Sequence, residues 1–557
     1  MGLEYRIYCR YSLGSKVVRI GNGCRMIRIS QIKLPIKHDE KEMTQAIAKA
    51  LKLASKKIKS YQIIKKSIDA RKDIVKYIYT VDVVVSMEGK ETESSIINRT
   101  HNVNITTSEK AQYSFVPTGE QKLCHRPVIV GTGPAGLFVA WLLAKHGYSP
   151  LVIERGEQIT KRVKAVEEFW TSNILNPDSN VQFGEGGAGT FSDGKLNTLV
   201  KDTFNRYRLV METFVQFGAP AEILYLNKPH IGTDKLRYVV ENMRNDIIKM
   251  GGEVRFETKL TDLMVKEGKL VAIELNHKEK VPCDILIPAI GHSARDTFDM
   301  FHTRGLALSP KAFAIGLRIE HNQSMISKSQ YGNDYIHLPA ADYKLTHQTT
   351  SGRGVYSFCM CPGGFVVNAS SEQGYLAVNG MSNYKRDEVN ANSAIVVTVQ
   401  PGDFAGDGPL RGMEFQRKWE QAAYQIGKGS VPVQLFGDLL RNRDSVTIGN
   451  VTPNIKGDYQ LTNLSNCLPK EVIDSIKEGV LAFDKRIKGF GDEEAVLSGV
   501  ESRTSSPVRI ERDDTYQSNI QGVYPCGEGA GYAGGITSAA IDGIKVFEAI
   551  TSLYRAR

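Results

Sequence analysis

A glycine-rich segment near residue 130 narrows most strongly the folds that this chain can adopt. It reads Val128-Ile-Val-Gly131-Thr-Gly133-Pro-Ala-Gly136, follows a predicted strand and opens an apolar helix. There Gly131 permits a tight turn, Gly133 lets the backbone approach a pyrophosphate, and Gly136 lets helix and sheet pack closely. The pattern predicts a Rossmann-type βαβ unit whose helix N-terminus binds a dinucleotide. The expected cofactor-binding residues of this turn are Gly131, Gly133, Pro134, Ala135 and Gly136.

An acidic residue stands at the end of the next predicted strand. The segment Pro150-Leu-Val-Ile-Glu154-Arg155 places Glu154 18 positions after the last glycine of the turn. A carboxylate at such a strand tip accepts hydrogen bonds from the adenosine ribose hydroxyls, and it disfavours a 2′-phosphate. We therefore expect Glu154, and Arg155 beside it, to contact the cofactor.

The other end of the chain bears on the choice between FAD and NAD. The segment from Gly522 to Gly543 predicts a strand, an acidic turn and a glycine-opened helix, and it resembles the closing FAD motif of the glutathione-reductase-like flavoprotein superfamily. The resemblance implies FAD as the cofactor, with Glu528 binding its ribityl or pyrophosphate portion. Aspartate is more usual at that place, which implies a longer or water-mediated contact. The other implied contacts are Gly527 and the N–H groups around Gly535, Ile536 and Thr537, at a helix end that would stabilise an anionic reduced flavin.

A third glycine-rich segment, Val181 to Leu196, has five glycines within eleven residues. Such a loop suits close passage of backbone along a cofactor, and Gly187 and Thr190 are its predicted contacts. With the stretches 283–291 and 501–509, the whole chain resembles the uncharacterised bacterial FAD-dependent, or NAD(FAD)-utilizing, dehydrogenases. The resemblance implies an FAD-dependent oxidoreductase and names no substrate.

Two absences from the sequence narrow the expected mechanism. No second GxGxxG follows a strand, which argues against a separate NAD-binding Rossmann domain, and no CxxxxC stands beside the first FAD strand, which removes that disulfide-reductase mechanism. Two routes stay open. Hydride passes directly between flavin N5 and a small organic substrate, or an NAD(P)H docks transiently without a fold of its own. A protein in which FAD is structural or sensory is a further alternative.

The candidates for the catalytic site are few. His230 precedes a predicted helix, where it could donate a proton near the flavin or cap the turn. Arg353, in a glycine-flanked turn, could clamp a substrate carboxylate or simply bond carbonyl groups. Cys359 and Cys361 would share one face of a strand, and we expect them to pack as small apolar groups rather than to form a redox pair.

Hydrophobic periodicity predicts the rest of the architecture. Period-two patterns indicate strands at 27–34, with a one-residue shift, and at 75–83, with a helix of about 41–58 between them. Later patterns indicate a strand at 313–319 and amphipathic helices at 415–426 and 472–483. We expect an α/β protein: a Rossmann-type FAD-binding domain with an inserted α+β substrate or cap domain and an N-terminal α+β ferredoxin-like module. The predicted boundaries are 1–110 for the basic module, 111–126 for a linker, 127–305 and 496–557 for the FAD-binding domain, and 306–495 for the inserted domain.

The positive charge of the chain is concentrated at its start. Residues 1–126 carry 24 Lys and Arg against 12 Asp and Glu, while the remainder carries 47 against 49. The basic module could therefore contact a polyanion such as RNA, an acidic protein or an anionic membrane surface, and a flavoprotein that docks to or modifies RNA is the alternative function. A solvated lysine-rich surface is the favoured interpretation, because no aromatic interleaving accompanies the charge.

The eight cysteines show neither a disulfide framework nor metal spacing, so no metal site is expected. The N-terminal residues lack the apolar core of a signal peptide, which favours a cytoplasmic location. The long apolar stretch at 127–144 is broken by glycines and prolines, and no membrane span is predicted. The pattern indicates no oligomeric state.

Overall fold

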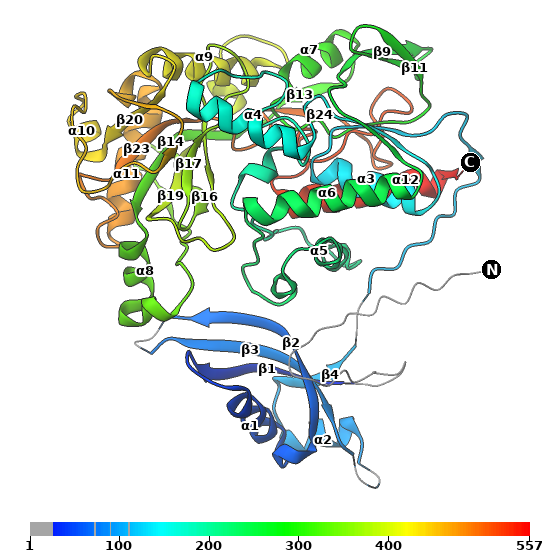
Figure 1. The fold of residues 1–557 in the computed structure, drawn as a ribbon, viewed down its shortest axis with the longest axis vertical. Coiled ribbons are helices and arrows are strands. Elements are labelled where there is room, and N and C mark those ends of the chain that lie inside the picture. Colours follow the sequence, from blue (N-terminus) through cyan, green and yellow to red (C-terminus); the bar gives the residue numbers. More distant parts are fainter. Residues whose placement is uncertain (1–25, 72–73, 88, 90, 110–111, 557) are drawn as a thin grey trace. The chain divides into compact units, whose positions relative to one another are not determined.

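The computed structural model of the protein describes residues 26–71, 74–87, 89, 91–109 and 112–556. The chain divides into two compact units, residues 1–111 and 112–557. Each unit has a hydrophobic core of its own. Figure 1 shows the elements of both units, coloured along the chain.

The first unit is a four-stranded antiparallel sheet with two helices. Its elements follow the order β-α-β-β-α-β of the split βαβ motif, and the strand order is β2-β3-β1-β4. Alternate residues of β1 and β3 form the core together with one face of α1. The elements are β1 (Met26–Pro35), α1 (Glu40–Leu51), β2 (Ile58–Asp69), β3 (Lys76–Val85), α2 (Glu93–Thr100) and β4 (Ile105–Ser108).

Local sequence accounts for most of this unit. The predicted one-residue shift in β1 is confirmed, because the register with β3 shifts between Ile29 and Ile32. The predicted helix was too long: α1 ends at Leu51, since Lys52 adopts the left-handed conformation and caps it. Strand β2 was not predicted, because lysines interrupt its hydrophobic alternation.

The second unit contains a parallel four-stranded sheet of Rossmann type, ordered β12-β6-β7-β8. An isolated parallel bridge joins Leu286 of β12 to Val523 and so extends the strand arrangement by one position. Helix α3 connects β6 to β7 and packs along α12 (Figure 1). The elements are β6 (Val128–Val130), α3 (Pro134–Lys145), β7 (Leu151–Ile153), α5 (Arg206–Gln216), α6 (Thr233–Lys249), β8 (Glu253–Arg255), β12 (Leu286–Pro288) and α12 (Ile536–Leu553).

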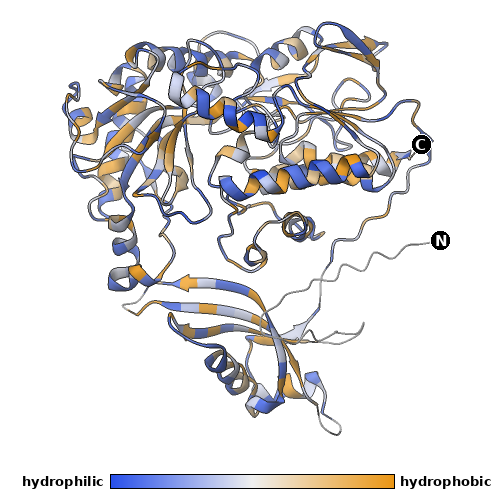
Figure 2. Ribbon diagram, viewed as in Figure 1, coloured by the Kyte–Doolittle hydropathy of each residue, from blue (hydrophilic) through white to orange (hydrophobic). Residues whose placement is uncertain are grey.

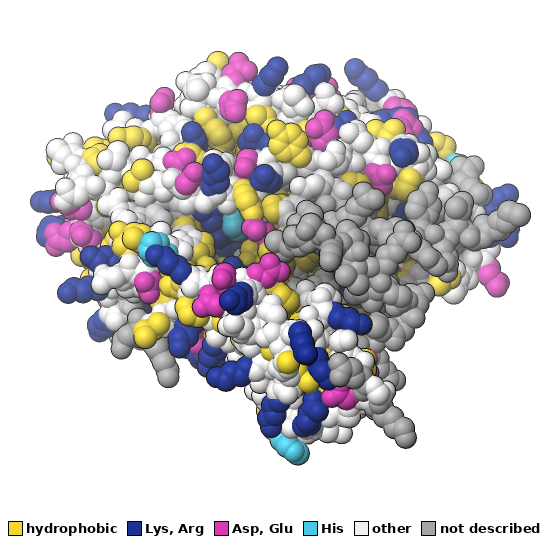
Figure 3. Space-filling model, turned by 60° about the horizontal axis from the view of Figure 1, so that its bottom comes forward, with side chains coloured by type: hydrophobic (Ala, Val, Ile, Leu, Met, Phe, Trp, Pro, Cys, Tyr) yellow, Lys and Arg dark blue, Asp and Glu magenta, His cyan; other side chains and the backbone are white. Residues whose placement is uncertain are grey.

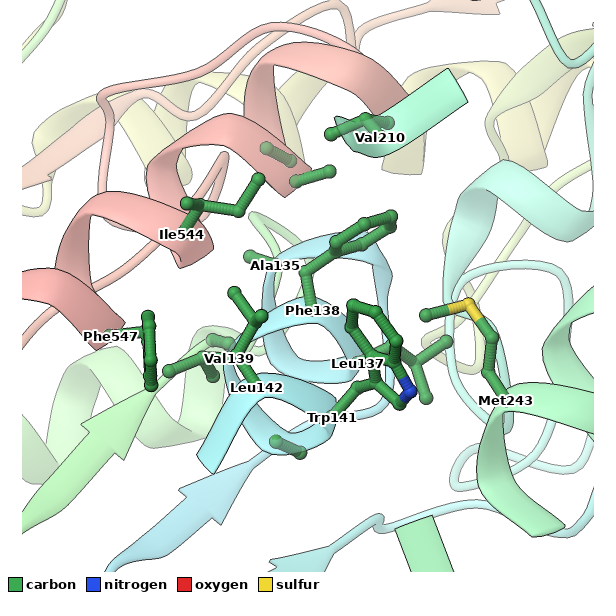
Figure 4. Close-up of a cluster of buried hydrophobic side chains, with 14 of the residues drawn as sticks. Ala135, Leu137, Phe138, Val139, Trp141, Leu142, Val210, Met243, Ile544 and Phe547 are labelled. Atoms are coloured by element: carbon green, nitrogen blue, oxygen red, sulfur yellow. The ribbon is translucent and has the colours of Figure 1, made fainter. Parts of the chain in front are cut away.

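Helix α3 is buried nearly all round, which explains the long apolar stretch in the sequence. Figure 4 shows Phe138 and Trp141 of α3 among Val210, Met243 and Ile544, which come from α5, α6 and α12. By contrast, α6 presents a hydrophobic and a polar face (Figure 2). Within the described part of the chain, every helix is too short or too polar to cross a membrane.

The predicted linker at 111–126 is not a separate segment: its residues 112–126 belong to the second unit. Tyr113 donates a hydrogen bond to Glu548 of α12 at 2.9 Å, and Phe115 packs edge-on against Phe547. Strand β5 (Gln121–Lys122) pairs with β25 (Tyr554–Arg555). The polar composition of this segment concealed these contacts, because they depend on α12 at the far end of the chain.

A second sheet of seven strands, ordered β15-β16-β19-β14-β23-β20-β22, forms its own core from residues 313–500. The predicted strand at 313–319 and both predicted helices are present, as β14, α9 and α11. The elements are β14 (Phe313–Asn322), α8 (Gln323–Tyr331), β15 (Thr346–Gln348), β16 (Gly354–Cys361), β19 (Asn390–Val399), α9 (Arg411–Ile426), β20 (Val431–Leu435), α10 (Phe436–Leu440), β22 (Tyr459–Leu461), α11 (Lys470–Asp484) and β23 (Val496–Glu501).

One predicted boundary changes with this sheet. Strand β23 pairs with β14 and β20, so residues 496–501 lie in the seven-stranded sheet and not in the last part of the FAD-binding domain. The remaining elements flank the two large sheets. They are α4 (Ile159–Ser172), β9 (Leu260–Lys266), β10 (Lys269–Leu275), β11 (Glu279–Pro282), α7 (Arg295–Thr303), β13 (Leu308–Pro310), β17 (Phe365–Asn368), β18 (Val378–Met381), β21 (Ile455–Lys456) and β24 (Val508–Ile510).

A buried carboxyl group in β14 makes stability depend on pH. Burial raises the pKa of Glu320 to about 7, although Asn390 and Asn454 donate hydrogen bonds to it. Because the folded pKa lies above the ordinary value, the neutral acid is favoured in the fold, and stability is lost as the pH rises through this range. We expect the wild type to lose roughly 3 kcal/mol of unfolding free energy between pH 5 and pH 8 from this group. Urea unfolding at both pH values should show that Glu320→Gln lacks this loss; an unchanged pH dependence would contradict it.

Candidate cofactor site

The two glycine-rich segments at opposite ends of the sequence meet in space. A Cβ added to Gly527 would lie 2.7 Å from Cβ of Ala135, the second residue of α3. A Cβ on Gly543 of α12 would lie 2.5 Å from the carbonyl oxygen of Ala135. The lack of side chains at these two positions therefore lets the closing segment pack directly on the first turn.

The glycines of the first turn fall into two kinds. Gly131 has a φ of +102°, and a Cβ on Gly136 would lie 1.9 Å from the Gly131 carbonyl oxygen, so the protein itself requires both. At Gly133 an added Cβ would meet no heavy atom of the described residues within 4 Å, and its φ of −68° suits any residue. The space beside Gly133 at this helix start is therefore open, which fits the approach of a dinucleotide pyrophosphate.

The third glycine-rich loop links the first turn to the start of α12. Gly187 has a φ of +64°, and its Cβ would lie 3.1 Å from Gly133 Cα. The hydroxyl of Thr537 donates a hydrogen bond of 2.8 Å to the carbonyl of Leu196. Thr190 is buried, and within the described chain its hydroxyl has no hydrogen-bond partner, which leaves it available to a bound group. The predicted residues Gly535 and Ile536 lie at the same end of the loop, since a Cβ on Gly189 would contact Ile536.

Glu154 is buried at the tip of β7 and joins the first turn to the third loop. One carboxylate oxygen accepts bonds from both N–H and hydroxyl of Thr132, and the other accepts from the N–H groups of Gly156 and Gly184. These four bonds fix the relative position of the two loops. A hydrogen bond from the ribose to Glu154 would have to use carboxylate oxygens that already accept bonds from the protein. That contact stays a prediction.

Arg155 follows Glu154 on the same strand tip. Its guanidinium donates to Asp178 and Asp296 and lies 4.2 Å over the ring of Phe183. The side chain is therefore positioned by two carboxylates, and its contact with the cofactor stays a prediction.

The predicted flavin contact Glu528 is paired with a histidine that the sequence did not indicate. Nδ1 of His292 lies 2.8 Å from both carboxylate oxygens of Glu528, while its buried Nε2 has no partner among the described residues. His292 directly follows Gly291, just after the parallel strand β12, and this position was the available signal. Lys311 is near enough to Glu528 for the two to interact: burial lowers the pKa of Lys311, and the charge of Glu528 opposes that shift.

His230 belongs to a second polar cluster beside the third loop. Its Nε2 donates to the carbonyl of Tyr384 at 2.9 Å, and the two rings stack. Burial lowers the pKa of His230 and Arg386 lowers it further, so the ring is neutral at pH 7. Arg386 forms a buried ion pair with Asp193, and Lys195 lies 3.9 Å from that carboxylate. The observed bond is the one expected of a turn-capping histidine, and proton donation stays a prediction.

Arg353 lies in the turn between β15 and β16. Its guanidinium pairs with Asp403 at 2.8 Å and reaches the carbonyl of Thr398 at 3.4 Å. The described residues show no contact between Arg353 and the glycine-rich turns. The suggested role of Arg353, binding a substrate carboxylate, therefore stays a prediction.

A cavity of about 230 Å³ lies between the seven-stranded sheet and the turn before α12. Its walls include Tyr356, Phe358, Thr398, Thr504, Ser505 and Gly534. A larger hollow of about 420 Å³ on α6 is lined by none of the glycine-rich turns. The described residues hold no cluster of His, Cys, Asp or Glu that could bind a metal ion.

Comparison with protein families finds three matching regions. Residues 312–504 match the C-terminal domain-like family of FAD-dependent proteins, residues 129–204 an NAD(P)-binding Rossmann-like domain, and residues 26–84 a domain of unknown function. With the parallel sheet and its glycine turn, these matches define an FAD-dependent protein with a Rossmann-type nucleotide-binding fold, and its cofactor is FAD.

The chain is 49% identical over 535 residues to an uncharacterized protein of Clostridium beijerinckii, an alignment that spans 95% of this chain and 99% of the relative. The chain belongs to the same family as that protein. Solved structures with low overall similarity include glycine oxidase from Geobacillus kaustophilus (10% identity, TM-score 0.35, 76% of this chain and 94% of that one) and L-proline dehydrogenase from P. horikoshii (12%, 0.31, 78% and 94%).

Proposed function

We propose that the protein transfers a hydride between N5 of the flavin and a small organic substrate bound in the cavity beside Gly534. The observation that carries this proposal is the position of that cavity. Gly534, from the turn that opens α12, forms one wall, and Phe358 of the seven-stranded sheet forms another. A volume of about 230 Å³ suits a small molecule rather than a polymer. The likeness of the closing segment to glutathione-reductase-like flavoproteins supports a flavin ring at this turn.

Bound FAD would supply the hydride chemistry, and the chain supplies position and electrostatics. The first N–H groups of α12, at Ile536 and Thr537, have no partner within the helix, so this end carries partial positive charge toward the turn. Phe358 and Tyr356 give the cavity aromatic walls, and the hydroxyl of Ser505 can orient a polar substrate, whereas the Thr504 hydroxyl already donates to the carbonyl of Ala314. His292 holds the carboxylate of Glu528 in place.

NAD(P)H that docks transiently is a second candidate electron partner. The Rossmann-like match covers residues 129–204, which is the turn proposed here for FAD, and so indicates no second nucleotide site. The direction of the reaction therefore has to come from experiment.

The test is anaerobic reduction of the purified yellow protein by a panel of small metabolites and by NADH and NADPH. We expect one compound to reduce the flavin and so bleach its absorbance. Phe358→Trp fills the cavity and should lower the second-order rate constant of this reduction at least tenfold, or ~1.4 kcal/mol. The FAD content of the variant should be unchanged. Tyr459→Trp, at an exposed position in β22, is the control and should bleach at the wild-type rate. If light reduces the flavin but no compound of the panel does, a structural or sensory flavin is favoured instead.

A polyanion contact through residues 1–110 stays a prediction, as does the cytoplasmic location. Basic side chains are spread over the surface shown in Figure 3. Some of the module's charges are used internally, since Arg28 pairs with Asp82 and Lys57 with Glu91. The solvated basic surface favoured by the sequence also stays a prediction.

A further inference from the structure

Two cysteines of β16 lie two residues apart at an irregularity of the strand. The register between β16 and β19 shifts between Phe358 and Cys361, and Cys359 has a φ of +46°. A bulge of this kind bends a strand, and here the Cys361 thiol donates a hydrogen bond of 3.3 Å to the backbone carbonyl of Cys359. Cys361 is fully buried, whereas Cys359 is partly exposed. The sequence-based expectation of two buried packing thiols therefore fails for Cys359.

The surroundings of the pair shift the pKa values of the two thiols in opposite directions. The hydrogen bond from Cys361, and then the charges of Lys195 and Arg318, lower the pKa of the Cys359 thiol against the opposing effects of burial and Glu501. The same contact, burial and Asp193 raise the pKa of the Cys361 thiol. One thiolate beside one protonated thiol is the arrangement that thiol–disulfide chemistry requires.

The positive charges near the pair are held by the fold. Arg318 is buried in β14, where Glu501 accepts its Nε at 3.0 Å, and its Nη1 lies 3.3 Å from the carbonyl oxygen of Cys359. A Cβ on Gly380 of β18 would lie 2.1 Å from Arg318 Nη1 and 2.8 Å from Cys361 Sγ, so this glycine makes room for the cluster. Asn392, opposite Cys361 in β19, has a buried Nδ2 with no partner in the described chain.

The pair borders the cofactor site from two sides. Phe358, next to Cys359, lines the cavity that Gly534 closes. Lys195 is adjacent to Leu196, whose carbonyl accepts the hydroxyl of Thr537 at the start of α12. Cys359 is therefore the chain neighbour of a residue that lines the cavity proposed for the substrate.

We propose that Cys359 and Cys361 form a second two-electron centre that exchanges electrons with the FAD. In the oxidising direction the Cys359 thiolate and the Cys361 thiol form one S–S bond, and the Cys361 S–H bond breaks. The electron pair and the Cys361 proton pass to oxidised FAD, and one proton from solvent completes the neutral reduced FAD. In reverse, the disulfide accepts the pair. The inference uses the flavin position given under the proposed function, but it does not require the small organic substrate.

The test begins with an anaerobic dithionite titration of air-oxidised holoprotein, followed by the flavin absorbance. Wild-type protein is expected to consume two electrons more per FAD than Cys359→Ser or Cys361→Ser. Cys124→Ser, which changes an exposed cysteine outside the pair, is the matched control and should behave as wild type. Equal electron uptake by all four proteins would overturn the proposal.

Mass spectrometry gives a second readout that does not depend on activity. Trypsin releases both cysteines on one peptide, residues 354–385. In oxidised protein this peptide should resist alkylation and weigh about 2 Da less than the dithiol form, and after reduction it should take two alkyl groups. Free alkylation of both cysteines in oxidised protein would refute the disulfide. A colourless protein would contradict the proposed function, whereas a yellow protein without the additional electrons contradicts only the dithiol centre.

Discussion

Glu420→Ala is expected to lower the unfolding free energy of the second unit by about 3–5 kcal/mol. Glu420 is fully buried on α9, and its two carboxylate oxygens accept hydrogen bonds from Arg295 and Arg503, both nearly buried. Ser502 adds a further bond at 2.6 Å. Removal of the carboxylate would leave two buried guanidinium groups without their shared counter-charge, which costs more than the pair contributes when intact.

This carboxylate also joins distant parts of the chain. Arg295 begins α7, Glu420 lies on α9 and Arg503 follows β23, so the cluster fastens the seven-stranded region to the nucleotide-binding region. Burial alone would raise the pKa of Glu420, but the two arginines hold the pKa well below its usual range. Its stabilising effect is therefore complete at neutral pH and is lost only on acidification.

Urea unfolding at pH 7, followed by tryptophan fluorescence and FAD release, measures the effect. Glu414→Ala is the control on the same helix, because Glu414 is 61% exposed and pairs with Arg417 at the surface. We expect that variant to change stability by less than about 1 kcal/mol. Equal unfolding midpoints for the two variants would show that the buried cluster contributes no more to stability than the surface ion pair.

Gly133→Val is expected to weaken FAD binding at least about 100-fold, or ~2.7 kcal/mol, without unfolding the protein. The φ of Gly133 allows a side chain, and a Cβ there meets no described atom within 4 Å. The substituent would occupy the space through which the pyrophosphate approaches the helix start. The structural requirement for glycine here thus comes from the ligand and not from the protein.

Gly402→Val makes the matched comparison, since Gly402 also has open space around its Cβ position and no positive φ. FAD content after purification and the dissociation constant from fluorescence titration are the measurements, with circular dichroism as the check of folding. The interpretation fails if Gly133→Val retains FAD as tightly as Gly402→Val does.

Local sequence determined the elements that bind the nucleotide. The turn at 131–136 and helices α3 and α12 could be predicted because glycine sterics and hydrophobic periodicity act over a few residues. The same local reasoning missed β2, because its lysines interrupt the hydrophobic alternation of a strand that its pairing with β3 defines. It also placed the end of the inserted domain before β23. The sequence of a buried strand does not indicate which sheet the strand will join.

Only the tertiary structure decided which side chains meet. His292 reaches Glu528 across more than 200 positions, and Lys195 approaches Cys359 from a different domain segment. Neither pair has a sequence signature, since side-chain contacts between distant residues depend on how sheets and loops pack. The sequence by itself thus determined the cofactor class, while the charged groups and thiols proposed to act beside the cofactor were brought together by the packing of the seven-stranded sheet against the nucleotide-binding fold.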